Sequence, residues 1–407
     1  MLARRVIPLM MAGLTACAAL GPAGPTTGSD RVLVLGSSHG VVSVDPGSGS
    51  VLFQGSGVPS SSDWSTLFTA IPDAGGTILQ SRDSATGEAL SSLPVTGELA
   101  VRVATPDGSL VALMPPLPAG ASPWVPEPRS STTITVADPS GLQEPRQFRL
   151  DGNFEPDAFS ADRGTLFLIS YVPPTAPTGY RVAALDLSDG SVSRVKTGVK
   201  GVAETMSGTR LEQVASADGS MLYTLYTTRP PDQVVPGTES ADHVGFVHTL
   251  SLEQGWAHCV PLPEELWGGD PADQAMAISA DGDLLYVVDT ASRVVAVMDT
   301  ASLEMTAREG VELAPDREGE TRAVIGPEGA LVVSSGPDVV SLDAETLSPI
   351  GGWTFEASVV ALGTGAGEIY VAVPGAVHAV SPGGDRADPK VRAPVVDDLS
   401  YVGMLER

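Results

Sequence analysis

Residues 280–303, ADGDLLYVVDTASRVVAVMDTASL, contain the pattern that decides the fold of this 407-residue chain. The stretch begins with a turn sequence, Asp281-Gly282, and continues with a short apolar run rich in Leu, Val and Tyr. A second apolar run ends at Asp299 and leads into another polar turn. Short runs of this composition, bounded by Asp, Gly, Ser and Thr, are typical of β-strands joined by tight turns. The stretch therefore predicts antiparallel strands.

The same unit, a small or polar turn followed by an apolar strand, recurs along the chain. Its copies are anchored at Asp30, Asp63, Asp107, Asp162, Asp218, Asp281, Glu328 and Gly367. After residue 30 no window shows a helical apolar stripe, and residues 262–269 are expected to form one short helical turn at most. Four short antiparallel strands per copy, repeated around a ring, describe a β-propeller. We predict an all-β fold with one propeller, residues 30–407, of eight four-stranded blades. Seven blades is the alternative, because the residues before Asp63 are poor in strand formers.

Two stretches resemble known propeller families. Residues 280–303 resemble the repeat of YVTN-type propellers, which are relatives of the WD40-like class. Residues 222–262, with LYTLY, FVHTL and HCVPLP, resemble uncharacterised propeller lipoproteins of actinobacteria. The resemblance implies a propeller over nearly the whole mature chain. It implies no catalytic residues, because the family has none assigned.

The two ends of the predicted propeller are expected to meet. The first copy, residues 30–55, contains only three strand-like runs. The C-terminal segment of residues 399–405, LSYVGML, is strand-like and follows a complete last copy. We expect it to supply the missing innermost strand of the first blade, which would remove the open edges that invite aggregation.

The N-terminus is predicted to be a lipoprotein signal peptide, residues 1–16. Arg4 and Arg5 precede an apolar run that is too short to span a bilayer permanently. The following sequence, LTAC, resembles a bacterial lipobox and places the lipid on Cys17. An ordinary secretory signal with an incidental cysteine is the alternative.

The lipidated Cys17 and the small, polar residues after it are predicted to form a flexible tether, residues 17–29. The only other cysteine is Cys259, so lipidation of Cys17 leaves no intramolecular disulfide. We therefore expect an extracytoplasmic protein that is attached to the cell membrane by a lipid anchor.

The composition excludes several classes of partner. The chain has 49 Asp and Glu against 23 Lys and Arg, a formal net charge of −26. Nucleic acids and anionic lipid surfaces are bound by clustered Lys and Arg, so neither is an expected partner. Hydrophobic residues make up 42% of the chain, enough to bury a large core. We expect a monomer.

Strand order predicts where a binding surface lies. In an antiparallel four-stranded blade, the loops between the second and third strands and those leading to the next blade share one face. Long insertions occur in such loops at residues 115–131, 172–179, 229–243 and 262–274. Long loops on rigid scaffolds often bind partners, so we predict a rim that binds an envelope protein, peptide or glycan. The candidate residues are Trp124, Tyr171, Arg229, His243 and Trp267. The alternative is that these loops vary in length without function.

The expected innermost strands favour a binding module over an enzyme. Segments such as VRVAT (101–105) and VVALG (359–363) are small and apolar, whereas acid–base catalysis needs paired titratable groups. We predict no catalytic residue and no cofactor. A propeller-type hydrolase or lyase acting on a small extracellular substrate is one alternative, and a structural envelope component is another.

No metal site is predicted either. His243, His248, His258 and Cys259 fall in one copy, but their spacing matches no common zinc pattern.

Overall fold

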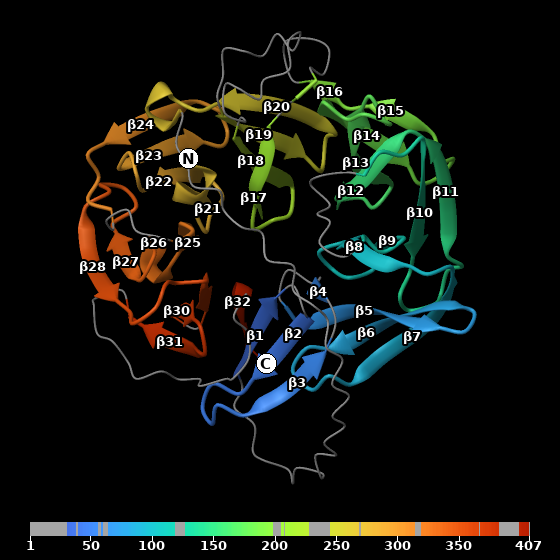
Figure 1. The fold of residues 1–407 in the computed structure, drawn as a ribbon, viewed down its shortest axis with the longest axis horizontal. Helices are drawn as coiled ribbons and strands as arrows, with labels where there is room; N and C mark the ends of the chain where they lie inside the picture. The colour runs from blue at the N-terminus through green and yellow to red at the C-terminus, as the bar shows by residue number, and fades with distance from the viewer. Residues whose placement is uncertain are drawn as a thin grey trace, which may run out of the picture.

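Figure 1 shows the computed structural model, which describes residues 31–37, 40–55, 58–59, 64–118, 127–197, 205–206, 208–227, 245–267, 270–313, 319–365, 367–381 and 399–406. The strands of these residues form eight sheets arranged around one axis. The predicted all-β propeller of eight blades is confirmed, and the seven-bladed alternative is wrong.

Blades 1 to 4 follow one another along the chain, and the strands of each are given from the axis outward. Blade 1 contains β32 (Leu399–Glu406), β1 (Arg31–Ser37), β2 (Gly40–Val44) and β3 (Val51–Gly55). Blade 2 contains β4 (Val58–Pro59), β5 (Thr66–Asp73), β6 (Gly76–Asp83) and β7 (Ala89–Thr96). Blade 3 contains β8 (Ala100–Ala104), β9 (Val111–Met114), β10 (Ser131–Ala137) and β11 (Arg146–Asp151). Blade 4 contains β12 (Asn153–Phe159), β13 (Thr165–Val172), β14 (Gly179–Asp186) and β15 (Val192–Arg194).

Blades 5 to 8 complete the ring. Blade 5 contains β17 (Thr209–Ala215), β18 (Met221–Thr227), β19 (Gly245–Ser251) and β20 (Trp256–Pro261), with β16 (Lys196–Thr197) parallel to β20 at the outer edge. Blade 6 contains β21 (Gln274–Ile278), β22 (Leu284–Asp289), β23 (Val294–Asp299) and β24 (Met305–Glu309). Blade 7 contains β25 (Arg322–Ile325), β26 (Leu331–Ser335), β27 (Asp338–Leu342) and β28 (Pro349–Thr354). The described strands of blade 8 are β29 (Ala361–Gly365), β30 (Glu368–Val373) and β31 (Ala376–Val380).

Three short 3-10 turns lie between strands: η2 (Glu264–Leu266), η3 (Pro271–Asp273) and η4 (Pro327–Gly329). The helical turn expected within residues 262–269 is η2. The predicted signal peptide of residues 1–16, Cys17 and the tether of residues 17–29 lie outside the described residues. In the part that is described, no helix is both long enough and apolar enough to cross a membrane.

The chain closes the ring with its C-terminal strand. β32 pairs antiparallel with β1, and its register places Leu405 opposite Val32 and Val402 opposite Leu35. Blade 1 is thus completed by the two ends of the described chain, as the sequence predicts (Figure 1). The inner edge of β1, which would otherwise expose unpaired backbone groups, is covered in this way.

The apolar core lies between the blades. The described residues form eight apolar clusters, one in each interface between neighbouring blades. The second strand of each blade is covered on both faces, which explains why it reads as a continuous apolar run. In β22, for example, Leu285, Tyr286 and Val287 are each at most 1% exposed.

The recurring Asp-Gly sequence is the turn between the first and second strands of a blade. The Asp281 carboxylate accepts hydrogen bonds from the Ser279 hydroxyl at 2.6 Å and from the Asp283 backbone N–H at 3.1 Å. The hydroxyl bond and the backbone bond lower the pKa of Asp281. Gly282 has a φ of 81°, a left-handed conformation that glycine adopts without strain. These local requirements explain why the sequence repeats at this position.

Candidate functional site

The described parts of the long insertions share one face of the ring. The loop between β9 and β10 and the loop between β13 and β14 both join second to third strands. The segment between β20 and β21 leads from one blade to the next. Because neighbouring strands run in opposite directions, these connections leave the ring on the same side. We call this side of blades 3 to 5 the loop face.

A buried asparagine ties two of these loops together. Asn153, at the start of the innermost strand β12, is fully buried. Its Nδ2 atom donates to the backbone oxygens of Glu127 at 2.9 Å and Pro174 at 3.1 Å, which belong to the loops of blades 3 and 4. The backbone N–H of Arg129 also donates to Pro174 O, at 3.1 Å. The two loops are therefore held against each other and against β12.

The side chain of Arg129 adds further contacts, and we call the bonded group of Arg129, Asn153 and Glu155 the brace. Its Nε atom donates to Asn153 Oδ1 at 2.6 Å, and its Nη2 atom donates to Phe154 O at 2.8 Å and to the Glu155 carboxylate. The other oxygen of Glu155 lies 3.7 Å from Nε of Arg102 on β8. Arg102 in turn donates from Nη2 to the backbone oxygen of Pro115, at the start of the blade 3 loop. One carboxylate that is 2% exposed thus holds two arginines at the base of the loops.

A second buried ion pair lies next to the first. Arg210 on β17 donates to Asp157 on β12 at 2.9 Å, and both side chains are almost fully buried. Gln213 donates to the same carboxylate oxygen at 3.2 Å and to the Thr224 hydroxyl at 3.0 Å. These contacts join the innermost strands of blades 4 and 5.

These ion pairs correct one expectation from the sequence. The innermost strands were expected to be small and apolar, which holds for β21 (QAMAI) but not for β12 (NFEPDAF) or β17 (TRLEQVA). The segment NFEPDAF precedes the anchor Asp162 by the usual distance, so its place as an innermost strand was available from the repeat. Strand propensity does not predict this segment, because Asn, Asp and Glu are depleted in β-strands.

Another carboxylate of an innermost strand, that of Glu212, has unusual electrostatics. It accepts a hydrogen bond from the backbone N–H of Met276 on β21 at 2.6 Å. Burial raises its pKa to about 7, although this hydrogen bond and the charge of Arg322 both act in the opposite direction. Glu212 therefore exchanges a proton near neutral pH.

Tyr171, one of the residues predicted to bind a partner, lies in a buried aromatic row at the interface of blades 4 and 5. Its ring meets Tyr180 edge-on at 6.4 Å, Tyr180 stacks on Tyr226 at 5.0 Å, and Tyr226 stacks on Phe246 at 5.1 Å. Tyr171 is 6% exposed, and burial raises the pKa of its hydroxyl. Its ring therefore offers little free area, and its role in binding stays a prediction.

Trp267, the second such residue in the described part of the chain, follows η2 and is half-buried. Its indole Nε1 donates to Leu262 O at 2.9 Å, while Gln274 donates to Leu266 O at 3.1 Å. Both bonds shape the segment that leads into blade 6. The other candidates, Trp124, Arg229 and His243, and the predicted lipid site Cys17, lie outside the described residues.

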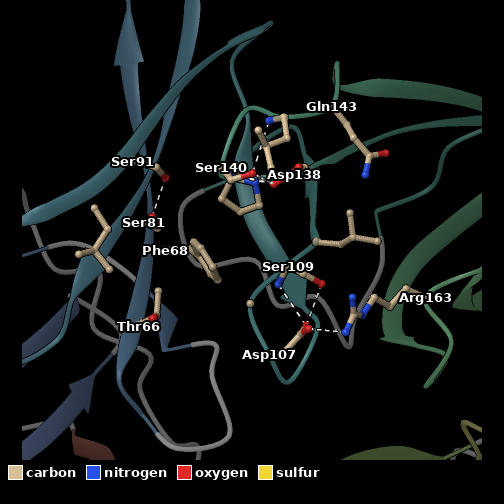
Figure 2. A pocket seen from close by; sticks show the side chains of 15 residues that line it. Thr66, Phe68, Ser81, Ser91, Asp107, Ser109, Asp138, Ser140, Gln143 and Arg163 are labelled. Carbon is tan, nitrogen blue, oxygen red and sulfur yellow. Dashed lines mark hydrogen bonds and ion pairs between the residues drawn. The ribbon is translucent and has the colours of Figure 1, made fainter. Parts of the chain in front are cut away.

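The opposite side of the ring contains a groove of about 670 Å³ between blades 2 and 3 (Figure 2). Its lining includes Asp107, Asp138 and Arg163 from turns, and the exposed Leu90 and Leu142. The Arg163 guanidinium pairs with Asp107 at 2.5 Å, as Figure 2 shows, and Asp138 accepts from the Ser140 hydroxyl. Asp107 and Arg163 thus pair with each other, and Asp138 is bonded to a neighbouring hydroxyl. The rest of the lining mixes apolar side chains with hydroxyl and amide groups.

Among the described residues no three His, Cys, Asp or Glu side chains are grouped so that they could hold a metal ion. His248 on β19 is buried, and burial lowers its pKa to about 4, so the imidazole is neutral at neutral pH. His258 and Cys259 lie on the adjacent strand β20.

The structure is similar to several solved structures. It matches apo AztD from Citrobacter koseri with a TM-score of 0.58 and 12% identity, over 92% of this chain and 97% of that one. It matches the dihydro-heme d1 dehydrogenase NirN, solved in complex with DHE, with a TM-score of 0.53 and 12% identity, over 95% of this chain and 78% of that one. The Dos1 propeller matches with a TM-score of 0.51 and 14% identity, over 88% of each chain. Likeness at such identity shows the fold alone. No protein-family model matches the sequence, and no curated protein matches it.

Proposed function

We propose that this protein is a lipid-anchored, extracytoplasmic propeller that binds an envelope protein, peptide or glycan through its loop face. The observation that carries the proposal is the brace formed by Arg129, Asn153 and Glu155. Burying charged and polar groups is expensive unless every partner is placed well. Here Arg129, Asn153 and Glu155 are placed at the base of surface loops, where they bond to one another and to the backbone of both loops.

The brace acts on the loops before any partner arrives. Each loop that must be ordered on binding weakens affinity through lost conformational entropy, and loops ordered in advance avoid this loss. Residues such as Thr175 and Glu127 are exposed beside the braced backbone and would meet the partner first. A rigid scaffold that presents fixed loops is a common basis of specific binding.

Site-specific photo-crosslinking in intact cells tests the loop face. A photoreactive residue is placed at Glu127 or Thr175 on the loop face, and at Ser302 in an exposed turn on the opposite face as the matched control. We expect one and the same partner from the first two positions and none from Ser302. Equal yields from all three positions, or no product from either loop position, would refute the proposal.

The membrane anchor is tested separately through Cys17. Cys17→Ala removes the thiol that the lipobox-like sequence presents for acylation, so we expect the protein to leave the membrane fraction. Cys259→Ala, the other single-cysteine change, should leave fractionation unchanged. Membrane retention of Cys17→Ala would contradict the anchor.

One observation favours a second candidate, a propeller-type hydrolase or lyase that acts on a small extracellular substrate. Glu212 lies on an innermost strand with a pKa of about 7, which suits a general acid or base. Its hydrogen bond to Met276 also has a purely structural use, because it satisfies a backbone N–H of β21. The test is incubation with a small-molecule extract of the envelope, read by mass spectrometry. If the wild-type protein changes the mass of a compound and the Glu212→Gln variant does not, the enzymatic function is favoured. Equal conversion by both proteins excludes Glu212 as the acid or base.

A further inference from the structure

A row of side chains crosses blade 5 on the face that packs against blade 4. The strand register places Gln213 opposite Thr224, Thr224 opposite His248, and His248 opposite Cys259. Residues opposite each other on antiparallel strands project from the same face, with Cβ atoms about 4.5–5.5 Å apart. The row therefore runs from the buried Asp157–Arg210 ion pair outward to a thiol.

The thiol at the end of this row contacts a second sulfur. The Sγ atom of Cys259 lies 3.4 Å from the Sδ atom of Met206. Met206 is 7% exposed, and its backbone is fixed by two hydrogen bonds with Tyr180, of 2.9 and 2.8 Å. A metal–thiolate bond of about 2.3 Å would put two sulfur ligands at a tetrahedral angle roughly 3.8 Å apart. The observed separation needs only a small outward shift to admit a metal ion.

The interface of blades 4 and 5 that contains the two sulfurs also contains an imidazole and an unsatisfied hydroxyl. The His248 ring lies on the same face as Cys259 and meets Tyr226 edge-on at 6.4 Å. The Tyr180 hydroxyl is buried and has no hydrogen-bond partner among the described residues. His258 precedes Cys259 on the strand and therefore projects from the opposite face, since consecutive strand residues alternate.

We propose that Cys259, Met206 and His248 form a binding site for Cu(I). Thiolate and thioether sulfur are soft ligands that select Cu(I), and imidazole also suits copper. Zn²⁺ is bound by thiolate, imidazole and carboxylate, so a thioether in the set disfavours it. On binding, Cys259 releases its proton to solvent and the oxidation state of copper does not change. The site lies between two blades and does not depend on the loop-face proposal.

Anaerobic titration of the full detergent-solubilised chain with Cu(I), in competition with a chromophoric Cu(I) chelator, tests the site. We expect one Cu(I) per chain and thiolate-to-copper absorption in the ultraviolet. Cys259→Ser and Met206→Leu nearly keep the side-chain volume and should weaken the affinity for Cu(I) by roughly 100-fold or more. Loss of a residue that contacts only a ligand, and not the metal, typically costs about 10–100-fold. His258→Gln, one residue away on the opposite face, should leave the affinity unchanged. The same titration on Cys17→Ala should still give one Cu(I).

A second measurement covers the case in which a variant does not fold. In the wild-type chain, Cu(I) should protect Cys259 from alkylation by iodoacetamide, as read by mass spectrometry of the peptide. Absence of Cu(I) binding, binding that survives Cys259→Ser, or unprotected Cys259 would overturn the proposal. Tighter binding of Zn²⁺ than of Cu(I) at the same residues would overturn the assignment to copper.

Discussion

Arg129, in a surface loop of blade 3, donates its Nε hydrogen to Oδ1 of Asn153, the first residue of the innermost strand of blade 4, over 2.6 Å. The two residues belong to different blades, and the bond joins the rim of the propeller to its centre. Because Asn153 also binds the loop of blade 4 through Pro174 O, one buried amide organises two loops. This relationship ties the described parts of both loops to the innermost strand of blade 4.

Replacing Arg129 by Met should destabilise the fold and loosen both loops. The change removes the positive charge that lies beside the Glu155 carboxylate. Glu155 is 2% exposed, and its remaining ion pair among the described residues is the 3.7 Å contact with Arg102. Removing one partner of a buried ion pair lowers the free energy of unfolding by about 3 kcal/mol. Urea unfolding measures this change, and hydrogen exchange of the loop amides measures the loosening.

The control for this variant is Arg163→Met. Arg163 pairs with Asp107 at 2.5 Å, but both side chains are about half exposed. Surface pairs of this kind contribute about 1 kcal/mol or less. Equal destabilisation by the two changes would mean that the buried brace has no special role.

Deleting residues 397–407 should strongly destabilise the propeller. The deletion removes β32, exposes the inner edge of β1 and opens the ring between blades 8 and 1. We expect the melting temperature to fall by roughly 10 °C or more, as followed by circular dichroism. Removal of residues 18–29, the part of the predicted tether that follows Cys17, is the control and should leave the melting temperature unchanged. An unchanged melting temperature after the C-terminal deletion would contradict the closure.

Glu212→Gln should change how stability depends on pH. The pKa of Glu212 is raised from 4.5 to about 7 in the fold, so the folded state holds this proton more tightly than the unfolded state does. The stability that the protonated carboxyl contributes to the fold is fully present below pH 4.5 and is lost as the pH rises through 7. Gln cannot ionise and can still accept the hydrogen bond from Met276. We therefore expect the variant to match wild type at pH values below about 4.5 and to exceed its free energy of unfolding by about 3 kcal/mol at pH 8.

Denaturant unfolding at a series of pH values measures this difference. Glu345→Gln is a suitable control, because Glu345 is exposed in the turn between β27 and β28. Parallel pH profiles for wild type and Glu212→Gln would show that Glu212 has an ordinary pKa.

Much of the architecture was predictable from local sequence. The turn at Asp281-Gly282 is formed by hydrogen bonds between residues at most five positions apart, so the same residue types recur wherever this turn occurs. The buried second strands read as apolar runs because both of their faces are covered. The strand-like C-terminus and the incomplete first copy together indicated how the ring closes.

The candidate sites were harder to predict, because their residues are distant in sequence. Arg210 reaches Asp157 across 53 positions, and Cys259 reaches Met206 across the same separation. A register shift between Pro156 and Ala158 in β12 also interrupts the alternation from which facing could be inferred.

The sequence by itself determined the repeated blade, the number of copies and the joining of the chain's two ends, because strand propensity and turn hydrogen bonds act over a few residues. Only the tertiary structure decided which charged, sulfur and imidazole groups meet. Those contacts depend on how neighbouring blades pack and how loops fold back onto another blade's strand, and both are set by the whole ring.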